Sequence, residues 1–147
     1  MCREVRKKCE CGKENVQLHM RDNVMGEEVI SRLFCPHCSV NVEYDSATMV
    51  RDNGWILEYD MDMAHFFAVS KLMIDPTHVQ PEYIFDQGYA TWQEMYPGEQ
   101  RDILAEREEI MSLAKKEPRL YLEKISSWNI ARVNRLKEEG WRKALQA

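Results

Sequence analysis

Four of the five cysteines stand in two close pairs, Cys9 with Cys11 and Cys35 with Cys38. A zinc ion takes four soft ligands at tetrahedral corners, with Zn–S bonds of about 2.3 Å. One pair on a tight turn supplies two corners, so two pairs can complete such a site. Because four sulfur ligands leave no position for water, the pattern predicts a structural rather than a catalytic metal centre.

Residues inside and beside the pairs favour the tight turns that this geometry needs. Pro36 lies within the second pair and fixes its own backbone angle. Gly12 follows the first pair and can adopt a left-handed conformation. The alternatives are two disulfides, free buried thiols, or iron in place of zinc, either as an ion or as an iron–sulfur cluster.

The compartment helps to decide between these alternatives. The first eight residues are charged and lack an apolar run, so we expect no signal peptide and a cytoplasmic location. Disulfides are rare in a reducing cytosol, where this cysteine spacing favours a metal site. Cys2, His19 and His37 could each replace a ligand, and Cys2 could also bridge two chains.

The segment between the pairs is predicted to form strands. Residues 16–21 alternate apolar and polar side chains, and residues 29–34 are β-branched and aromatic. Gly26 stands near the midpoint, where the chain would reverse. The pattern predicts that these two strands form a hairpin with each other, and that residues 40–44 add a third strand.

Two cysteine pairs joined by a hairpin resemble the zinc-ribbon family. The resemblance covers about residues 5–45 and is carried by Cys9, Cys11, Gly12, Cys35, Pro36 and Cys38. Ribbons usually have two residues inside both pairs, whereas the first pair here has one, and Ser39 stands where glycine often follows. The resemblance implies a structural Zn²⁺ ion. Zinc ribbons occur widely in transcription and translation proteins.

A second hairpin and a helix are predicted next. Asn53-Gly54 favours a type I′ turn between β-prone flanks, and this hairpin could extend the ribbon sheet. Residues 60–74 then predict a helix, capped by Asp60 or Asp62. Its apolar residues fall on one side at helical spacing: Met63, Phe66, Phe67, Met73 and Ile74.

Aromatic residues dominate the following stretch. Phe85, Tyr89, Trp92 and Tyr96 recur at steps of 4, 3 and 4 residues and predict a helix over residues 81–96. Such a stripe usually faces a core. If exposed, these four side chains would form the candidate binding surface, because aromatic residues bury a large area at little entropic cost.

The C-terminal part predicts a helical hairpin of residues 99–116 and residues 118–140. Acidic residues at the start of the first helix and Lys115-Lys116 at its end match the helix dipole. Pro118 suits the first position of the second helix. We therefore predict an α+β protein with a zinc-ribbon and β-hairpin domain over residues 1–60 and a helical domain over residues 61–147.

The net charge of −5 is unevenly distributed. Residues 1–39 carry +1, residues 40–117 carry −10 and residues 118–147 carry +4. An acidic middle would repel a phosphate backbone, so charge does not favour extensive nucleic-acid binding. Basic residues near the cysteines leave a local contact open: Arg3, Arg6, Lys7, Lys8, Lys13, Arg21 and Arg32.

The sequence favours a binding role over an enzymatic one. It contains no glycine-rich phosphate loop, HExxH motif or nucleophile elbow. We expect a protein-interaction or assembly module, such as a dimer, because residues 61–145 hold more apolar surface than a ribbon needs. Nucleic-acid binding is the alternative. The longest apolar runs fall well short of about 18 residues, so no membrane span is expected.

Overall fold

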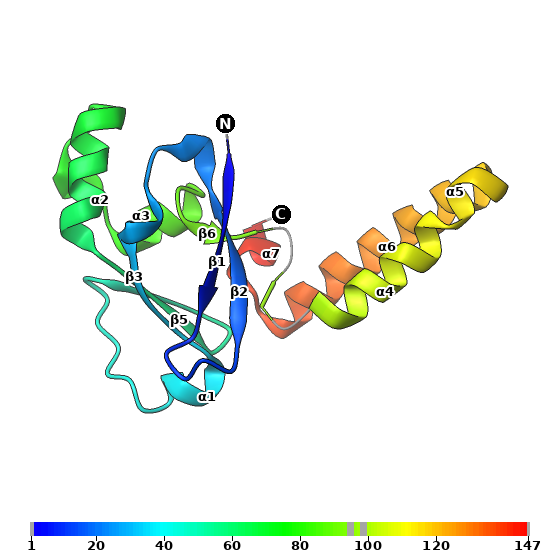
Figure 1. Ribbon diagram of the computed structural model, residues 1–147, viewed down its shortest axis with the longest axis horizontal. Helices are drawn as coiled ribbons and strands as arrows, with labels where there is room; N and C mark the ends of the chain where they lie inside the picture. Colours follow the sequence, from blue (N-terminus) through cyan, green and yellow to red (C-terminus); the bar gives the residue numbers. More distant parts are fainter. Residues whose placement is uncertain (1, 94–95, 98–99, 147) are drawn as a thin grey trace. The chain divides into compact units, whose positions relative to one another are not determined.

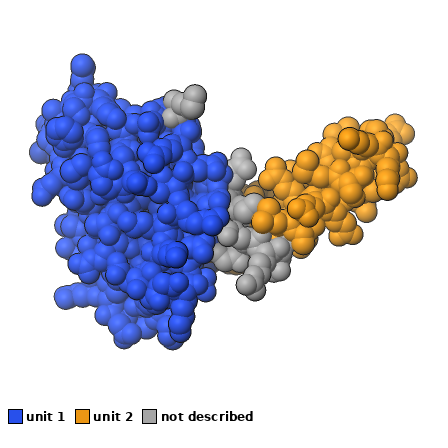
Figure 2. All heavy atoms as spheres, viewed as in Figure 1, with its two compact units in different colours: residues 1–97 blue, residues 98–147 orange. Residues whose placement is uncertain are grey.

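The computed structural model describes residues 2–93, 96–97 and 100–146, and its side chains over residues 2–93, 96–97 and 103–145. The chain divides into two compact units, Met1–Pro97 and Gly98–Ala147 (Figure 2). Antiparallel strands occupy the first unit and helices the second, so the predicted order of strands followed by a helical hairpin is confirmed (Figure 1).

Unit 1 contains two three-stranded antiparallel sheets (Figure 1). The first has the order β1-β2-β6, with strands Arg3–Lys8, Asn15–Met20 and Thr91–Trp92. The second has the order β3-β5-β4, with strands Ile30–Phe34, Trp55–Tyr59 and Met49–Asp52. Strand β5 lies at the centre of this sheet, pairs along both edges and is buried along most of its length.

The strands between the cysteine pairs form as predicted, but the hairpin predicted between them is wrong. Strand β2 pairs with β1 and β6, and β3 pairs with β5. The residues before Cys9 supply a nearer partner for β2, because a short turn closes β1 onto it. Gly26 has an ordinary extended conformation, and the short 3-10 helices Arg21–Asn23 and Glu27–Val29 carry the chain from one sheet to the other.

The chain after Cys35 turns into a short helix rather than a strand. Helix α1 (Pro36–Ser39) has Pro36 at its first position, and Val40 beyond it is 77% exposed. The third strand predicted over residues 40–44 is therefore wrong. The hairpin predicted at Asn53-Gly54 is confirmed: it joins β4 to β5, and both turn residues have positive φ angles of 47° and 88°.

Helix α2 (Met61–Phe67) begins at the predicted cap, where the Met63 amide donates to Asp60 Oδ1 at 3.2 Å. It continues as a π-helical turn, Ala68–Leu72, that ends at the left-handed residue Met73. The single apolar side predicted for this helix is wrong in part. Phe67 is buried, but Phe66 is 62% exposed and Met73 is 89% exposed.

The helix predicted over residues 81–96 ends early. Helix α3 (Pro81–Asp86) stops before Gly88, which has a φ of 80°, and strand β6 then pairs with β2. Residues 94–95 of the predicted helix lie outside the described residues. Pairing with an open strand edge satisfies the backbone of β6, which outweighs the helical spacing of the aromatic residues.

The segment from residue 61 to residue 97 belongs to unit 1. Two buried hydrogen bonds tie it to the second sheet. Trp92 Nε1 donates to Asp52 Oδ2 at 2.7 Å, and Tyr59 Oη donates to the Ala90 carbonyl at 2.6 Å. Trp92 also packs edge-on against Trp55, with 6.2 Å between ring centroids. The two sheets therefore share one core.

Unit 2 contains the predicted helical hairpin. Helix α4 (Gln100–Met111) and the short α5 (Leu113–Lys116) lead into α6 (Pro118–Glu139), and α7 (Arg142–Gln146) follows. Gly140 ends α6 in the left-handed conformation, and its amide donates to the Leu136 carbonyl at 3.1 Å. The predicted start at residue 99 lies outside the described residues. Within the described part of the chain, every helix is too short or too polar to cross a bilayer.

We predict that Gly54→Ala destabilises unit 1 more than Gly88→Ala does. Both glycines have positive φ angles, so each alanine costs about 1 kcal/mol or more. A Cβ at Gly54 would also lie 3.2 Å from Pro36 Cβ, whereas a Cβ at Gly88 meets no atom within 4 Å. Urea unfolding followed by tryptophan fluorescence measures both losses. Equal losses would contradict the contact with Pro36.

Candidate metal site

The first cysteine pair lies in the tight turn between β1 and β2. The Cys9 amide donates to the Glu14 carbonyl at 2.9 Å, and the Gly12 amide donates to the Cys9 carbonyl at 2.8 Å. Gly12 has a φ of 74°, so it takes the left-handed conformation that the sequence predicts. The Glu10 amide donates to the Leu33 carbonyl at 3.1 Å, which attaches this turn to β3.

The second pair lies where β3 ends and α1 begins. The Ser39 amide donates to the Cys35 carbonyl at 2.8 Å, and Ser39 Oγ donates to the Gly54 carbonyl at 2.6 Å. This side-chain bond ties the second turn to the β4–β5 hairpin. Beneath it, Cys38 packs on a small buried cluster of Phe34, Met49 and Ile56. Both cysteine turns therefore rest on the paired strands of unit 1.

The four sulfur atoms meet in one place. Cys9, Cys11, Cys35 and Cys38 bring their Sγ atoms within 4.8 Å of one another, and the Cys11 and Cys35 sulfurs are 4.0 Å apart. Tetrahedral Zn–S bonds of about 2.3 Å would place the sulfurs about 3.8 Å apart. All five cysteines are free thiols. The cluster could therefore hold a metal ion after a small contraction.

Access to the cluster is uneven. Cys9 and Cys35 are buried, Cys38 is half-buried and Cys11 is exposed. The Cys35 amide donates to Cys9 Sγ at 3.1 Å, so a backbone dipole already points at one sulfur. Such N–H···S bonds stabilise a thiolate and hold the orientation of a ligand.

The thiols differ in acidity. The Lys13 amide, followed by the Cys9 side chain, lowers the pKa of Cys11 to about 7. Burial raises the pKa of Cys9 above its ordinary value. Hydrogen bonding to Cys9, together with burial, raises the pKa of Cys38 to about 12. At neutral pH, Cys9 and Cys38 therefore keep their protons, which a bound cation would displace.

The other candidate ligands lie outside the cluster. Among the described residues, neither His19 nor His37 belongs to the group of converging ligand atoms. His19 lies on β2, His37 lies on α1, and Cys2 is exposed near the start of β1. The order of the strands, which places both turns together, was the part of this site that the sequence prediction missed.

The predicted aromatic surface lies largely inside unit 1. Phe85 and Trp92 are fully buried, Tyr96 is 8% exposed and Tyr89 is half-buried. Phe85 and Trp92 pack edge-on, with 6.0 Å between ring centroids. Tyr89 instead packs beside Tyr83 and under the Arg21 guanidinium. The condition that these four side chains be exposed is met in part by Tyr89 alone.

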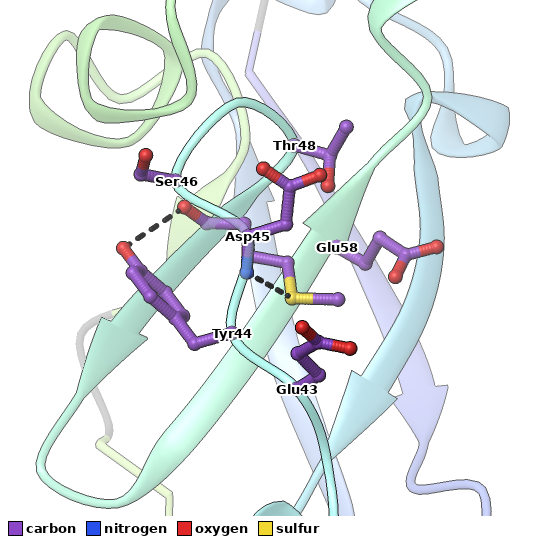
Figure 3. A pocket seen from close by; sticks show the side chains of 7 residues that line it. Glu43, Tyr44, Asp45, Ser46, Thr48 and Glu58 are labelled. Atoms are coloured by element: carbon purple, nitrogen blue, oxygen red, sulfur yellow. Dashed lines mark hydrogen bonds between the residues drawn. The ribbon is translucent and has the colours of Figure 1, made fainter.

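A polar pocket of about 600 Å³ lies beside β5, and its residues could not be identified from the sequence (Figure 3). The loop before β4 supplies Glu43 and Asp45, and β5 supplies Glu58. Glu58 forms an ion pair with Arg32, with 3.5 Å between Oε1 and Nε. In the sequence, only the negative net charge of residues 40–117 pointed toward such a pocket. The carboxylates of the pocket repel phosphate groups, so the pocket does not favour nucleic acid.

No protein-family model, no curated protein and no solved structure matches this chain.

We predict that the cysteine cluster binds added Zn²⁺ more weakly as the pH falls. Cys9 and Cys38 have raised pKa values, so at least these two thiols lose a proton on binding at neutral pH. The apparent affinity should therefore drop at least about 100-fold for each pH unit below neutrality. Competition with a chromophoric chelator at two pH values measures this slope, and a tenfold change or less would contradict it.

Proposed function

We propose that Cys9, Cys11, Cys35 and Cys38 hold a structural Zn²⁺ ion in a zinc-ribbon head. Among the described residues, the converging group consists of four thiols without a carboxylate or an imidazole. This composition supports zinc over a hard cation. The ion would supply a cross-link between two turns. It would have no open coordination position, so we assign it no catalytic step.

We further propose that the chain acts as a protein-interaction or assembly module. The observation that carries this proposal is the apolar surface left partly open between the helices of the α4–α6 hairpin. Ile110, Leu113 and Trp128 line a hollow there and are only half-buried. Unit 1 encloses its own core, so the stability of unit 1 does not require the apolar surface of the hairpin.

Nucleic-acid binding remains the alternative, and the surroundings of the basic residues support it less well. Arg3, Arg21 and Arg32 each lie within 4.0 Å of a carboxylate oxygen, from Glu27, Asp22 and Glu58 respectively. Lys7 Nζ donates to the Ile30 carbonyl at 3.0 Å. Phosphate binding draws on the summed positive charge, which these carboxylates partly cancel.

We predict one Zn²⁺ ion per chain in native protein, measured by elemental analysis together with native mass. Cys35→Ser should lose most of this metal, because it removes a buried ligand. Cys2→Ser is the matched control, because Cys2 lies outside the cluster, and it should keep the full metal content. Iron in place of zinc would refute the choice of metal. Full retention of metal by Cys35→Ser would refute the site.

We predict that a photo-reactive amino acid at position 113 forms covalent adducts with another protein chain in cells. Leu113 lines a hollow between α4 and α6, whereas Glu108 is exposed and lines neither hollow of the hairpin. The same amino acid at position 108 is the control and should give few adducts. Nuclease-sensitive adducts would instead support the alternative function. Equal yields at both positions would count against a specific protein surface.

A further inference from the structure

A groove runs between α4 and α6 within unit 2. It consists of two adjoining hollows of about 400 Å³ and 220 Å³, which share Glu106 and Trp128. Its apolar lining comes from both sides of the hairpin: Ile103, Ile110, Leu113, Trp128 and Ala131. We call these two hollows together the α4–α6 groove.

The two long helices bury little apolar surface of their own. Among their described side chains, Ile103 and Leu136 are the buried hydrophobic residues. Ile110, Ile125 and Trp128 are only half-buried. Helical bundles normally enclose such inward positions on all sides, which a pair of helices cannot do. Two helices alone therefore leave the described apolar lining of this groove only partly enclosed.

The groove has an acidic rim and a basic rim. Glu106 and Glu109 line it from α4, whereas Lys124, Arg132 and Arg135 line it from α6. Trp128 Nε1 donates to Glu106 Oε2 at 2.8 Å and spans the two helices. The net charges of the two helices agree with these rims, because α4 carries a net charge of −2 and α6 a net charge of +2.

A surface with opposite charge on its two edges can complement itself by rotation. When two such hairpins face each other across a two-fold axis parallel to the helices, each α4 lies over the α6 of the other copy. Acidic rims then face basic rims on both sides. With the axis perpendicular to the helices, α4 would lie over α4, and like charges would meet. Charge thus selects the first arrangement.

We propose that the occupant of the α4–α6 groove is a second copy of this chain, in a dimer joined through an antiparallel four-helix bundle. The inference rests on the proposed function, because it names the partner of the same hairpin. In this bundle Glu109 of each copy faces Lys124 of the other, since both residues line the same hollow. The apolar lining of both grooves becomes the bundle core.

The exposed residues of the opposite flank provide a contrasting surface. Leu104 and Met111 each follow a groove residue by one position, which places them about 100° further around α4. They are exposed apolar residues without lining either hollow. Substitution of Leu104 therefore tests whether association uses the groove or the other flank.

The test is a charge exchange in zinc-loaded, full-length protein, followed by sedimentation velocity over a range of concentrations. The unmodified chain should form dimers. Glu109→Lys and Lys124→Glu should each weaken self-association by about tenfold or more, because two attractive contacts become repulsive. An equimolar mixture of the two variants should recover the dimer, since each rim again meets its opposite.

The mixture separates association from folding. In either variant, the charges across the groove within one chain stay mismatched, so recovery can only come from contacts between chains. Glu108→Lys makes the same charge change at a neighbouring position outside both hollows, and it should leave the dimer intact. Circular dichroism should show unchanged helix content in all three variants.

Several outcomes would overturn the dimer. These are a monomer at every concentration, no recovery on mixing, an effect of Glu108→Lys equal to that of Glu109→Lys, or dissociation by Leu104→Asp but not by Glu109→Lys. A monomer that still forms position-specific adducts at position 113 with a different protein would overturn self-pairing alone. A monomer without such adducts would overturn the proposed interaction function as well.

Discussion

The structure of unit 1 depends on bringing two tight turns together, so that four thiols converge. Each turn is first fixed locally, by a left-handed glycine at one and by a proline at the start of α1 at the other. Two hydrogen bonds then hold the turns together: the Glu10 amide donates to the Leu33 carbonyl, and the Cys35 amide donates to Cys9 Sγ. A metal ion would add strength to a geometry that strand pairing has already arranged.

The core of unit 1 supports the two cysteine turns, which are too short to hold their positions alone. The Trp92–Asp52 hydrogen bond and the Trp55–Trp92 contact join residues from both sheets in a region shielded from water. A buried carboxylate is costly unless it is hydrogen-bonded, so this contact favours one arrangement of the sheets over others. Phe85, Trp92 and Tyr96 therefore contribute to the core that supports the cysteine turns, whereas Tyr89 lies nearer the surface.

Unit 2 differs from unit 1 because its helices are well specified locally but bury few side chains. Its helices have good local signals, including Pro118 at the start of α6 and Gly140 after its end, but few fully buried side chains. Local capping specifies where a helix begins and ends, whereas burial supplies most of its stability. A hairpin of this composition is therefore well defined as secondary structure and incomplete as a packed unit, which is the physical basis for assigning it an interaction surface.

The sequence by itself determined features that depend on neighbouring residues: the two close cysteine pairs, the Asn53-Gly54 turn, the cap at Asp60 and the ends of α6. Tertiary structure decided which strands pair, where the units divide, and that β6 is a strand despite its helical aromatic spacing. The reason is that turns and caps gain their free energy within a few residues. Strand pairing draws on edges far apart in the chain, and local periodicity contains no information about which edge is open.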